Sequence, residues 1–241
     1  MSQGSQRVSI IIPTYNEVEN VGPLISELGS TLGDKDYQIL VVDDSSPDGT
    51  YEAVEEIAAQ NSRVQGIKRP GKLGLASAVL DGFRASDGDL VVMMDSDLSH
   101  RPQDLGALLE ASEDADIVIG SRYVKGSSII GLSPYRHLAS RTSIWLSKVM
   151  LGLPFRDTTS GFAVFRREVL EPLASGMNPV GFKLLLEVLV MCPQARVKEV
   201  PITFVNRKRG KSKFGVREVL VFLRLCNTLR SHRRSVTASV E

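Results

Sequence analysis

Short continuous runs of apolar residues alternate with longer amphipathic stretches through the first half of the chain. The apolar runs predict buried strands at residues 8–12, 39–42, 90–94 and 117–119. The stretches between them predict helices at residues 17–32, 50–60, 73–85 and 102–111. Because strands that are separated by helices form parallel sheets covered on both faces, this order predicts an α/β fold with a mainly parallel central sheet.

The second half of the chain is less regular. Helical patterns recur at residues 138–151 and 182–191, a polar loop lies around residues 157–161, and residues 200–205 predict a strand. No internal repeat, low-complexity tract or flexible linker separates the two halves. We therefore expect one domain with an elaborated second half.

Composition limits the classes of protein that need to be considered. Of 241 residues, 42% are hydrophobic and 24% are charged, which is typical of a globular protein. No uncharged apolar stretch approaches the roughly 18–20 residues that cross a bilayer, and residues 1–6 are too polar for a secretory signal. Cys192 and Cys226 form no Cys-x-x-Cys or Cys/His cluster, so neither a zinc site nor a disulfide framework is indicated. We expect a protein of a reducing compartment that is neither secreted nor membrane-spanning.

Charge is distributed unevenly, although the formal net charge is only +1. Residues 1–195 contain 17 Lys and Arg against 25 Asp and Glu, a net charge of −8. Residues 196–234 contain 12 against 2, a net charge of +10. This asymmetry indicates that the C-terminal part meets an anionic partner, such as phosphate, nucleic acid or a lipid surface.

Paired aspartates follow the predicted strand at residues 90–94. Asp95 and Asp97 flank Ser96 at the edge where a parallel sheet binds its ligand. Two carboxylates there suit a hard divalent cation that also contacts substrate phosphates. The alternative is an ordinary acidic turn in which Asp97 or Ser99 caps the helix that follows Pro102.

A second acidic group, Asp43 and Asp44, follows the strand at residues 39–42. Asp44 is a candidate acceptor of hydrogen bonds from a ribose or a base. Residues 46–50 combine Ser, Pro, Asp, Gly and Thr, and we assign them largely to turn formation.

Basic residues form the third candidate group. Arg122 follows the strand at residues 117–119, and Arg136 and Arg141 lie on or near one helix. Five further cations crowd residues 207–213, where the alternative is simply a solvated face. Arginine forks bind phosphate oxygens in pairs, so these residues are candidates for phosphate contacts.

The sequence lacks the motifs of several other classes of protein. Residues 210–212 resemble the end of a phosphate-binding P-loop, but the glycine required five positions earlier is Val205. No Gly-x-Gly-x-x-Gly follows the first strand, and no Gly-x-Ser-x-Gly occurs. Nucleic-acid binding by the basic segment stays an alternative, although only Phe204 and Phe214 interleave its cations.

These motifs, in this order, resemble the inverting family 2 glycosyltransferases of GT-A fold. The resemblance runs from about residue 8 to residue 229. Its further signatures narrow it to the dolichol-phosphate (polyprenol-phosphate) mannosyltransferase group. The motifs are Pro-Thr-Tyr-Asn-Glu at 13–17, Val-Val-Asp-Asp at 41–44, Ser-Pro-Asp-Gly-Thr at 46–50, Lys-Leu-Gly-Leu at 72–75, Asp-Ser-Asp-Leu-Ser-His at 95–100, Gly-Ser-Arg-Tyr at 120–123, Asp-Thr-Thr-Ser-Gly-Phe at 157–162, Val-Pro-Ile-Thr-Phe at 200–204 and Arg-Lys-Arg-Gly-Lys-Ser-Lys at 207–213.

The resemblance implies that GDP-mannose donates mannose to a polyprenyl (dolichyl) monophosphate with inversion, assisted by Mg²⁺ or Mn²⁺. It places the nucleoside on Pro13, Tyr15, Glu17, Val42 and Asp44. It assigns Asp95, Ser96 and Asp97 to the diphosphate and the metal, with Asp95 and Asp97 as metal ligands. It assigns Arg207 and Lys213 to further contacts with the donor phosphates. It assigns Arg122, Arg136 and Ser140 to the acceptor phosphate. Asp157 is a further candidate for a contact with the sugar or the metal. Relatives with similar motifs use UDP-glucose, so a polyprenyl-phosphate glucosyltransferase is the alternative, and a non-catalytic nucleotide-sugar or nucleic-acid binding module is another.

The expected domain limits follow from the same resemblance. We expect residues 8–214 to form the catalytic domain and residues 1–7 and 231–241 to form flexible ends. Residues 215–230 are predicted to be an amphipathic helix on a membrane surface or on a membrane-anchored partner, with packing on the catalytic domain as the alternative. Its apolar part, residues 216–229, spans only about 21 Å as a helix, too short to cross a bilayer. We expect a cytoplasmic protein, peripheral to the cytosolic face of a membrane, that binds no nucleic acid.

Overall fold

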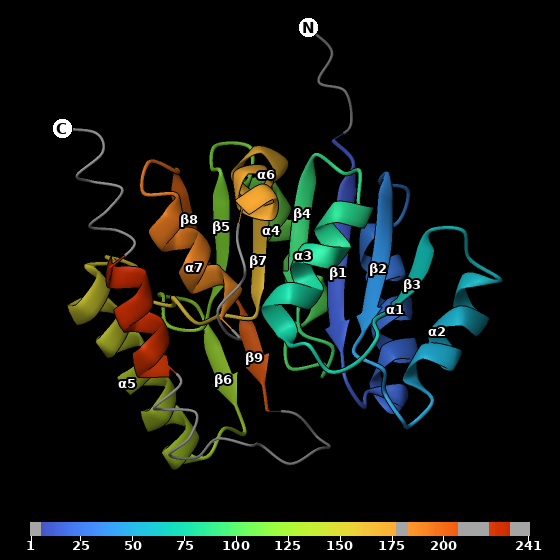
Figure 1. The fold of residues 1–241 in the computed structure, drawn as a ribbon, viewed down its shortest axis with the longest axis horizontal. Coiled ribbons are helices and arrows are strands. Elements are labelled where there is room, and N and C mark those ends of the chain that lie inside the picture. The colour runs from blue at the N-terminus through green and yellow to red at the C-terminus, as the bar shows by residue number, and fades with distance from the viewer. Residues whose placement is uncertain (1–5, 177–182, 207–221, 232–241) are drawn as a thin grey trace, which may run out of the picture.

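The computed structural model describes residues 6–176, 183–206 and 222–231. In these ranges a central sheet contains seven strands in the order β3-β2-β1-β4-β7-β5-β8 (Figure 1). A second sheet pairs β6 with β9. The strands are β1 (Val8–Thr14), β2 (Tyr37–Asp43), β3 (Val64–Lys68), β4 (Leu90–Met94), β5 (Ile117–Ser121), β6 (Ser128–Ile130), β7 (Phe162–Arg166), β8 (Val197–Pro201) and β9 (Thr203–Val205).

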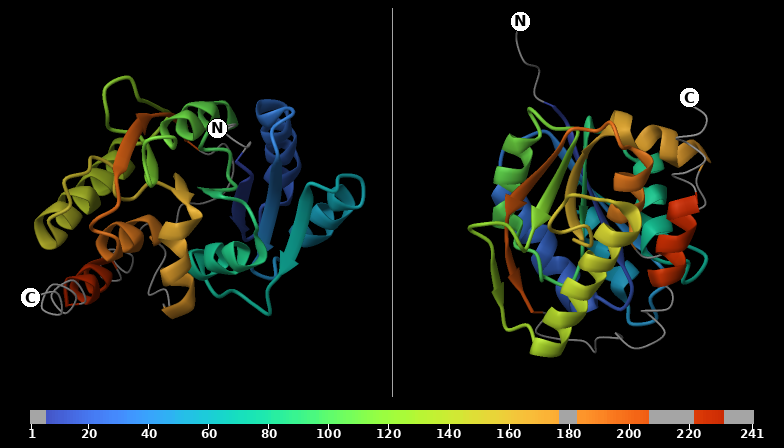
Figure 2. Two further views of the ribbon diagram at one scale, coloured as in Figure 1. Left: turned by 90° about the horizontal axis from the view of Figure 1, so that it is seen from above. Right: turned by 90° about the vertical axis from the view of Figure 1, so that its left-hand side faces the viewer.

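Helices cover both faces of the central sheet (Figure 2). Side chains alternate along β1, so Ile10 and Ile12 pack in the core beneath α1 and α4, whereas Ile11 packs in the core beneath α3. The helices are α1 (Val18–Leu32), α2 (Thr50–Ala58), α3 (Leu75–Ala85), α4 (Leu105–Ala111), α5 (Pro134–Leu151), α6 (Arg167–Gly176) and α7 (Leu184–Met191), with a 3-10 turn at Pro102–Asp104 and a helical segment at residues 222–231.

The four strands and four helices predicted for the first half are confirmed. Their continuous apolar runs are buried throughout β1, β4 and β5. The prediction missed β3, β6, β7, and α6. In particular, β7 runs antiparallel between β4 and β5, because the chain returns across the sheet after the polar loop at residues 157–161.

The single strand predicted at residues 200–205 is wrong. The chain changes sheets there, since β8 pairs with β5 in the central sheet and β9 pairs with β6 in the small one. Ile202 lies at the junction and is buried in the core. The predicted helix at residues 138–151 begins earlier, at Pro134, because the Ser133 hydroxyl accepts a hydrogen bond from the Arg136 backbone N–H.

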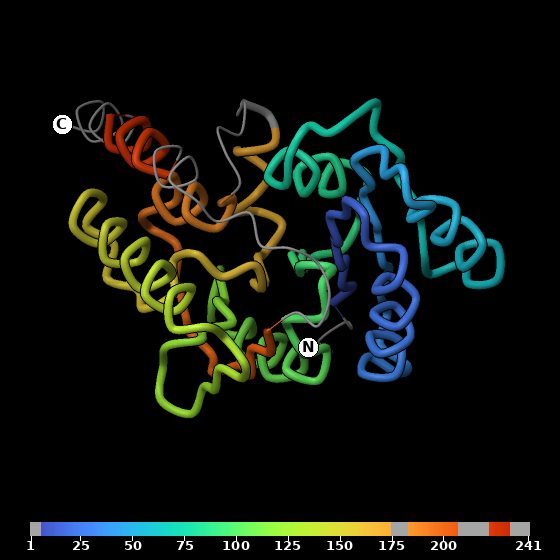
Figure 3. The backbone as a smooth tube through the Cα atoms, turned by 90° about the horizontal axis from the view of Figure 1, so that it is seen from below, coloured from blue at the N-terminus to red at the C-terminus, as the bar shows by residue number. Residues whose placement is uncertain are grey.

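The order of the strands creates a crevice between β1 and β4. From β1 the chain proceeds to β2 and β3 on one side, and β4 begins the other half of the sheet. In open α/β sheets, ligands bind at such a switch point, outside the carboxyl ends of the strands. Those ends lie at the lower edge of the sheet in Figure 1, which Figure 3 views from below.

Only the end of the predicted amphipathic segment at 215–230 can be followed, since residues 215–221 lie outside the described ranges. In the described part, Phe222, Leu225, Cys226 and Leu229 are buried in the same core as α7. Their apolar atoms therefore contact the domain. Residues 1–5 and 232–241, which include most of the predicted flexible ends, also lie outside the description.

Among the helices that the structure describes, none is both long enough and apolar enough to span a bilayer.

Candidate active site

A pocket of about 300 Å³ lies in the crevice between β1 and β4. It is built from three strand ends and the start of α3, as the predicted fold requires. Its lining includes seven of the predicted site residues, namely Pro13 near the end of β1, Tyr15 and Glu17 after it, Asp44 after β2, and Asp95, Ser96 and Asp97 after β4. The structure therefore brings together residues that lie more than 80 positions apart in sequence.

Val42 is the exception in this set. Its side chain is fully buried and packs in the core with Ile11 and the residues of α3, close to Gly82. The Val42 side chain does not line the pocket, because side chains alternate along β2 and this one points into the core, and the assignment of Val42 to the nucleoside stays a prediction.

Asp44 lines the pocket but is held by two partners. Its Oδ1 accepts a hydrogen bond from Nη1 of Arg69, and its Oδ2 accepts one from the Gly74 backbone N–H at 2.9 Å. Arg69 is itself buried and also donates to Asp81 and Ser77. A carboxylate has about four lone-pair sites, so Asp44 retains capacity toward a ligand while its orientation is set.

Sequence reasoning missed both Arg69 and the position of Lys72. The Lys72 ammonium lies 3.5 Å from the centroid of the Tyr15 ring, and both residues line the pocket. A cation over an aromatic face restrains the ring. The Lys-Leu-Gly-Leu motif was the available signal for Lys72, whereas no pattern in the sequence marks Arg69 as the partner of Asp44.

The turn at residues 46–50 holds the loop that carries Tyr15 and Glu17. The Ser46 hydroxyl accepts from the Asn16 N–H at 2.9 Å, and the Thr50 hydroxyl accepts from the Glu17 N–H at 2.9 Å. The Thr50 hydroxyl donates a hydrogen bond to the Asp48 carboxylate at 2.6 Å. These contacts agree with the assignment of this motif to turn formation and show that it also supports the pocket.

Asp95 fits closely against Gly161. The Asp95 N–H donates to the Gly161 carbonyl at 3.1 Å, and a Cβ at position 161 would overlap the Asp95 carboxylate. On another side, Nε2 of His100 lies 3.5 Å from Oδ2 of Asp95. His100 is buried and packs against the rings of Phe162 and Phe204.

Asp97 does not cap the following helix. Its Oδ1 accepts a hydrogen bond from the Ser99 N–H at 3.1 Å, and Leu98 between them adopts a left-handed φ of 58°. The 3-10 turn begins after Arg101 without a side-chain cap from any described residue. The alternative in which Asp97 or Ser99 caps this helix is wrong, because the two residues complete a tight turn of their own.

Two carboxylates with hard oxygen donors fit a divalent cation that shares its coordination with a substrate. Asp95 and Asp97 both border the pocket. Across the described ranges, no group of three or more His, Cys, Asp or Glu side chains could hold a metal by itself. Mg²⁺ typically takes one or two carboxylates together with substrate phosphates, so the donor set fits that mode.

Arg122 and Asp157 form a buried pair beside this pocket. The Asp157 carboxylate is fully buried and accepts from Nε of Arg122 at 2.7 Å and from Nη2 at 2.8 Å. Burial by itself would lower the pKa of the Arg122 guanidinium, but the Asp157 charge more than offsets this and raises that pKa. Asp157 was predicted to contact a sugar or metal; its oxygens instead hold Arg122.

Lys183, directly before α7, lies beside the Arg122–Asp157 pair and was not among the residues predicted from the sequence. Its ammonium donates to the Thr159 carbonyl at 3.4 Å. Burial, together with the nearby charge of Arg122, lowers the pKa of Lys183, while Asp95 and Asp157 act in the opposite direction. Lys183 therefore places a second basic group beside Arg122. A lysine before the apolar run of α7 was visible in the sequence, but nothing there placed it beside the loop at residues 157–161.

The predicted acceptor residues Arg136 and Ser140 lie one turn apart on α5. Ser140 accepts a hydrogen bond from the Tyr123 hydroxyl at 2.9 Å, and Arg136 donates through Nη1 to Asn206. Tyr123 directly follows Arg122, so the three predicted acceptor residues belong to one connected region. Arg207 and Lys213 lie outside the described residues.

The same fold occurs in a solved structure that contains a nucleotide sugar. The mannosyltransferase PcManGT from Pyrobaculum calidifontis, in complex with GDP-Man and Mn²⁺, has a TM-score of 0.61 and 18% sequence identity. The match covers 99% of this chain and 77% of that one. The fold is that of the GT-A glycosyltransferases, as predicted.

Sequence comparison gives the family. A model of glycosyl transferase family 2 matches residues 9–173. The chain is 42% identical over 221 residues to a dolichol-phosphate mannosyltransferase of Pyrococcus furiosus, covering 90% of this chain and 62% of that protein. It is 38% identical over 213 residues to an undecaprenyl-phosphate mannosyltransferase of Micrococcus luteus, covering 86% and 87%. The chain belongs to glycosyl transferase family 2, and it spans less than two thirds of the length of the Pyrococcus relative.

Proposed function

We propose that this chain is an inverting glycosyltransferase that transfers mannose from GDP-mannose to a polyprenyl monophosphate. The observation that carries the proposal is the convergence of Asp95, Asp97 and the residues after β1 on one pocket at the switch point of the sheet. The names of the two relatives support a polyprenyl-phosphate acceptor, and the GDP-Man complex of the PcManGT structure supports the donor.

The donor nucleoside occupies the pocket between Tyr15, Glu17 and Asp44, and its diphosphate extends toward Asp95 and Asp97. A divalent cation, Mg²⁺ or Mn²⁺, held by these two aspartates would stabilise the charge that develops on the departing diphosphate. Arg207 and Lys213 are assigned to the donor phosphates on the basis of the family motif.

The acceptor needs no general base. A phosphate monoester has a second pKa of about 6, so at pH 7 it is mostly a dianion whose oxygen is already a good nucleophile. That oxygen attacks the anomeric carbon from the face opposite the diphosphate, the carbon–oxygen bond to GDP breaks, and the electron pair leaves with GDP. Inversion follows from this in-line displacement.

Arg122, Arg136 and Ser140 are assigned to hold the acceptor phosphate in line. Asp157 accepts from Nε and Nη2 of Arg122, so it orients the guanidinium before substrate arrives and leaves Nη1 for the acceptor phosphate. Their cationic groups, with Lys183 nearby, offset the repulsion between two phosphorylated substrates. The acceptor is a lipid, so we place the enzyme at the cytosolic face of a membrane, with a membrane-anchored subunit as one means of attachment.

The proposal is tested by offering radiolabelled GDP-mannose and UDP-glucose separately, with a short polyprenyl phosphate and Mn²⁺. We expect labelled glycolipid from GDP-mannose. Product from UDP-glucose alone would instead identify a glucosyltransferase. No product from either donor, together with tight binding of a labelled nucleotide, would identify a binding module and overturn the proposal.

A further inference from the structure

Glu199 places a carboxylate on a covered face of the central sheet. It lies on β8, where side chains alternate between the two faces of the sheet. Val197, two residues earlier on the same face, packs against the core that contains α7, and Glu199 is itself partly buried. A carboxylate loses hydration at such a position, so its oxygens require hydrogen-bond partners from the protein.

The two oxygens of Glu199 accept hydrogen bonds from two successive backbone N–H groups. Oε2 accepts from the N–H of Arg156 at 2.8 Å, and Oε1 accepts from the N–H of Asp157 at 2.9 Å. Residues 152–161 connect α5 to β7 and belong to no strand, so no strand partner satisfies these two donors. Hydrogen bonds to a charged acceptor are stronger than those between neutral groups, and the two-point contact fixes the orientation of the loop as well as its position.

Asp157 connects this contact to Arg122. While its backbone N–H is bound to Glu199, its carboxylate accepts from the backbone N–H of Arg122 at 3.0 Å. The same carboxylate accepts from Nε and Nη2 of the Arg122 side chain. The carboxylate of Glu199 and the guanidinium of Arg122 are thus connected through one residue, which belongs to neither of their strands.

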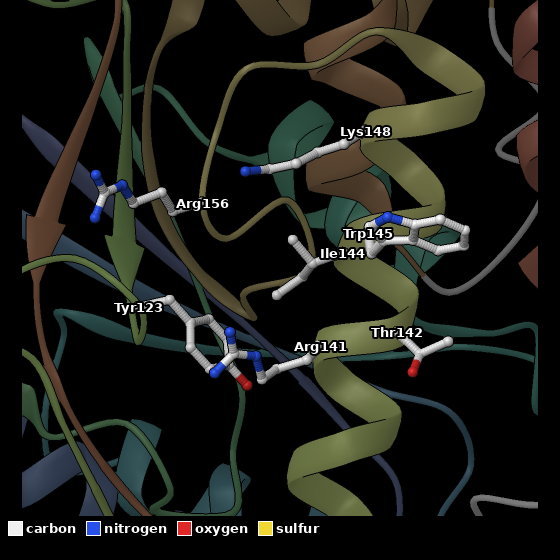
Figure 4. A pocket seen from close by; sticks show the side chains of 7 residues that line it. All are labelled: Tyr123, Arg141, Thr142, Ile144, Trp145, Lys148 and Arg156. Atoms are coloured by element: carbon white, nitrogen blue, oxygen red, sulfur yellow. The ribbon is translucent and has the colours of Figure 1, made fainter.

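The contact with Glu199 also supports one wall of a cleft beside the acceptor residues. The cleft has a volume of about 700 Å³, and its lining includes Tyr123, Arg141, Lys148 and Arg156. Figure 4 shows Arg141 and Lys148 extending from α5 toward the side of Tyr123 and Arg156. Because the Arg156 N–H is bound by Glu199, a shift of the loop would move this wall as well.

We propose that Glu199 is a positioning residue for the transfer reaction. It fixes residues 156–157, and through Asp157 it holds the Arg122 guanidinium where the acceptor phosphate binds. This inference deepens the proposed function and rests on it, because that function assigns Arg122 to the acceptor phosphate. Asp157 occupies Nε and Nη2 of Arg122, so a displaced loop would redirect the remaining Nη1.

The part of the loop that reaches Asp95 is held independently of Glu199. The Ser160 hydroxyl donates to the Gly120 carbonyl at 2.7 Å, and the hydroxyl oxygens of Thr158 and Ser147 lie 2.6 Å apart. Among the described residues, the lining of the pocket assigned to the donor includes neither Glu199 nor residues 156–157. Loss of the Glu199 contacts should therefore disturb the acceptor side and leave the donor side in place.

Glu199→Gln tests this role with little change in shape. The carboxamide offers a single acceptor oxygen, and its NH₂ group faces the second backbone N–H, so one of the two hydrogen bonds is lost. We expect kcat/KM for a short isoprenyl phosphate, at saturating GDP-mannose, to fall about 10-fold, less than the roughly 100-fold that a misplacement of 1 Å costs. The Kd of GDP with Mn²⁺, measured by calorimetry, should stay within about twofold of the wild type.

Asp116→Asn is the matched control. Asp116 directly precedes β5, and its carboxylate accepts from the Arg196 N–H at 2.8 Å, directly before β8. It therefore ties the same two strands together at the end that is distant from the site. This variant should retain kcat/KM for the acceptor within about twofold. Equal losses in the two variants, or an equal loss of GDP affinity and acceptor kcat/KM in Glu199→Gln, would show a general structural tie and overturn the proposal.

Hydrogen exchange followed by mass spectrometry makes the failure of this proposal distinguishable from failure of the proposed function. Peptides that contain residues 156–157 should exchange about 10-fold faster in Glu199→Gln, whereas peptides from β1 should be unchanged. Unchanged exchange, or faster exchange with unaltered acceptor kinetics, would overturn the role of Glu199 while the wild type still forms glycolipid. Absence of transfer by the wild type would instead be failure of the proposed function, and the role of Glu199 would be overturned with it.

Discussion

The guanidinium of Arg122 and the carboxylate of Asp157 meet in a two-point contact, with Nε 2.7 Å from Oδ2 and Nη2 2.8 Å from Oδ1. The Arg122 backbone N–H donates to the same carboxylate at 3.0 Å. Asp157 thus fixes both the main chain and the side chain of a residue assigned to the acceptor phosphate. The pair joins β5 to the loop before β7, two segments 35 positions apart.

Replacement of Asp157 by Ala should destabilise the fold. Removal of one member of a buried ion pair leaves its partner uncompensated and costs about 3–5 kcal/mol. For a domain of this size, this corresponds to a fall in Tm of roughly 6–20 °C. Thermal denaturation followed by circular dichroism measures the change. Asp114→Ala, which removes an exposed partner of Lys198, is the control and should leave Tm unchanged. Equal Tm values for the two variants would contradict the structural role of Asp157.

Replacement of Asp97 by Ala should abolish most of the proposed transfer. Charge stabilisation by a bound cation contributes several kcal/mol in the transition state, so we expect turnover to fall by about three orders of magnitude or more. Turnover is measured with labelled GDP-mannose at saturating Mn²⁺. The Asp114→Asn variant serves as the control because Asp114 is exposed and lies outside the pocket lining, and it should retain wild-type turnover. Wild-type turnover in Asp97→Ala would refute the metal assignment.

Gly161 and Gly106 offer a matched pair of Gly→Ala changes. A Cβ at Gly161 meets the Asp95 carboxylate, whereas a Cβ at Gly106, within α4, has no heavy atom within 4 Å. We expect Gly161→Ala to displace Asp95 and reduce turnover about 100-fold, a loss typical of a misplacement of about 1 Å. Gly106→Ala should retain activity and gain about 0.5–1 kcal/mol of stability because alanine favours the helix. Full activity of Gly161→Ala would show that the position of Asp95 is not critical.

His100→Phe tests whether the imidazole orients Asp95. Phenylalanine retains a ring between Phe162 and Phe204 but removes Nε2, which lies 3.5 Å from Asp95 Oδ2. Partners that orient a metal ligand typically contribute 10–100-fold to metal affinity, so the Mn²⁺ concentration for half-maximal activity should rise by about that factor. Calorimetric titration of Mn²⁺ with GDP present gives an independent measure. An unchanged Mn²⁺ requirement would show that His100 is only a packing residue.

The two cysteines should be unreactive in the folded protein. Burial raises the pKa of the Cys226 thiol to about 11 and also raises that of Cys192. At pH 7.5 roughly one Cys226 thiol in several thousand is therefore ionised, and only the thiolate is a nucleophile. Mass spectrometry after iodoacetamide treatment should find little labelling until urea is added. Rapid labelling of Cys226 without urea would contradict its burial.

Local pattern determined much of the fold. Continuous apolar runs such as Leu90–Met94 are strands buried on both faces, and they were readable because burial on both sides removes every polar position from the run. The carboxyl ends of those strands then located Asp44, Asp95 and Asp97 at one edge of the sheet. The motifs of the family pointed to the same residues, and the pocket contains them.

Tertiary structure alone decided which groups face one another. The bonds between Arg69 and Asp44, Arg122 and Asp157, and Tyr123 and Ser140 join positions 17 to 35 residues apart, and no periodicity in the sequence encodes such distances. The antiparallel placement of β7 likewise depends on pairing with β4 and β5 rather than on its own five residues. Composition and spacing determine whether a segment is buried and whether it forms a strand or a helix, because those properties depend on its own side chains. Which segments lie next to one another is determined by the packing of the whole core. The partners of Arg122 and of Glu199 are therefore visible only in the folded chain.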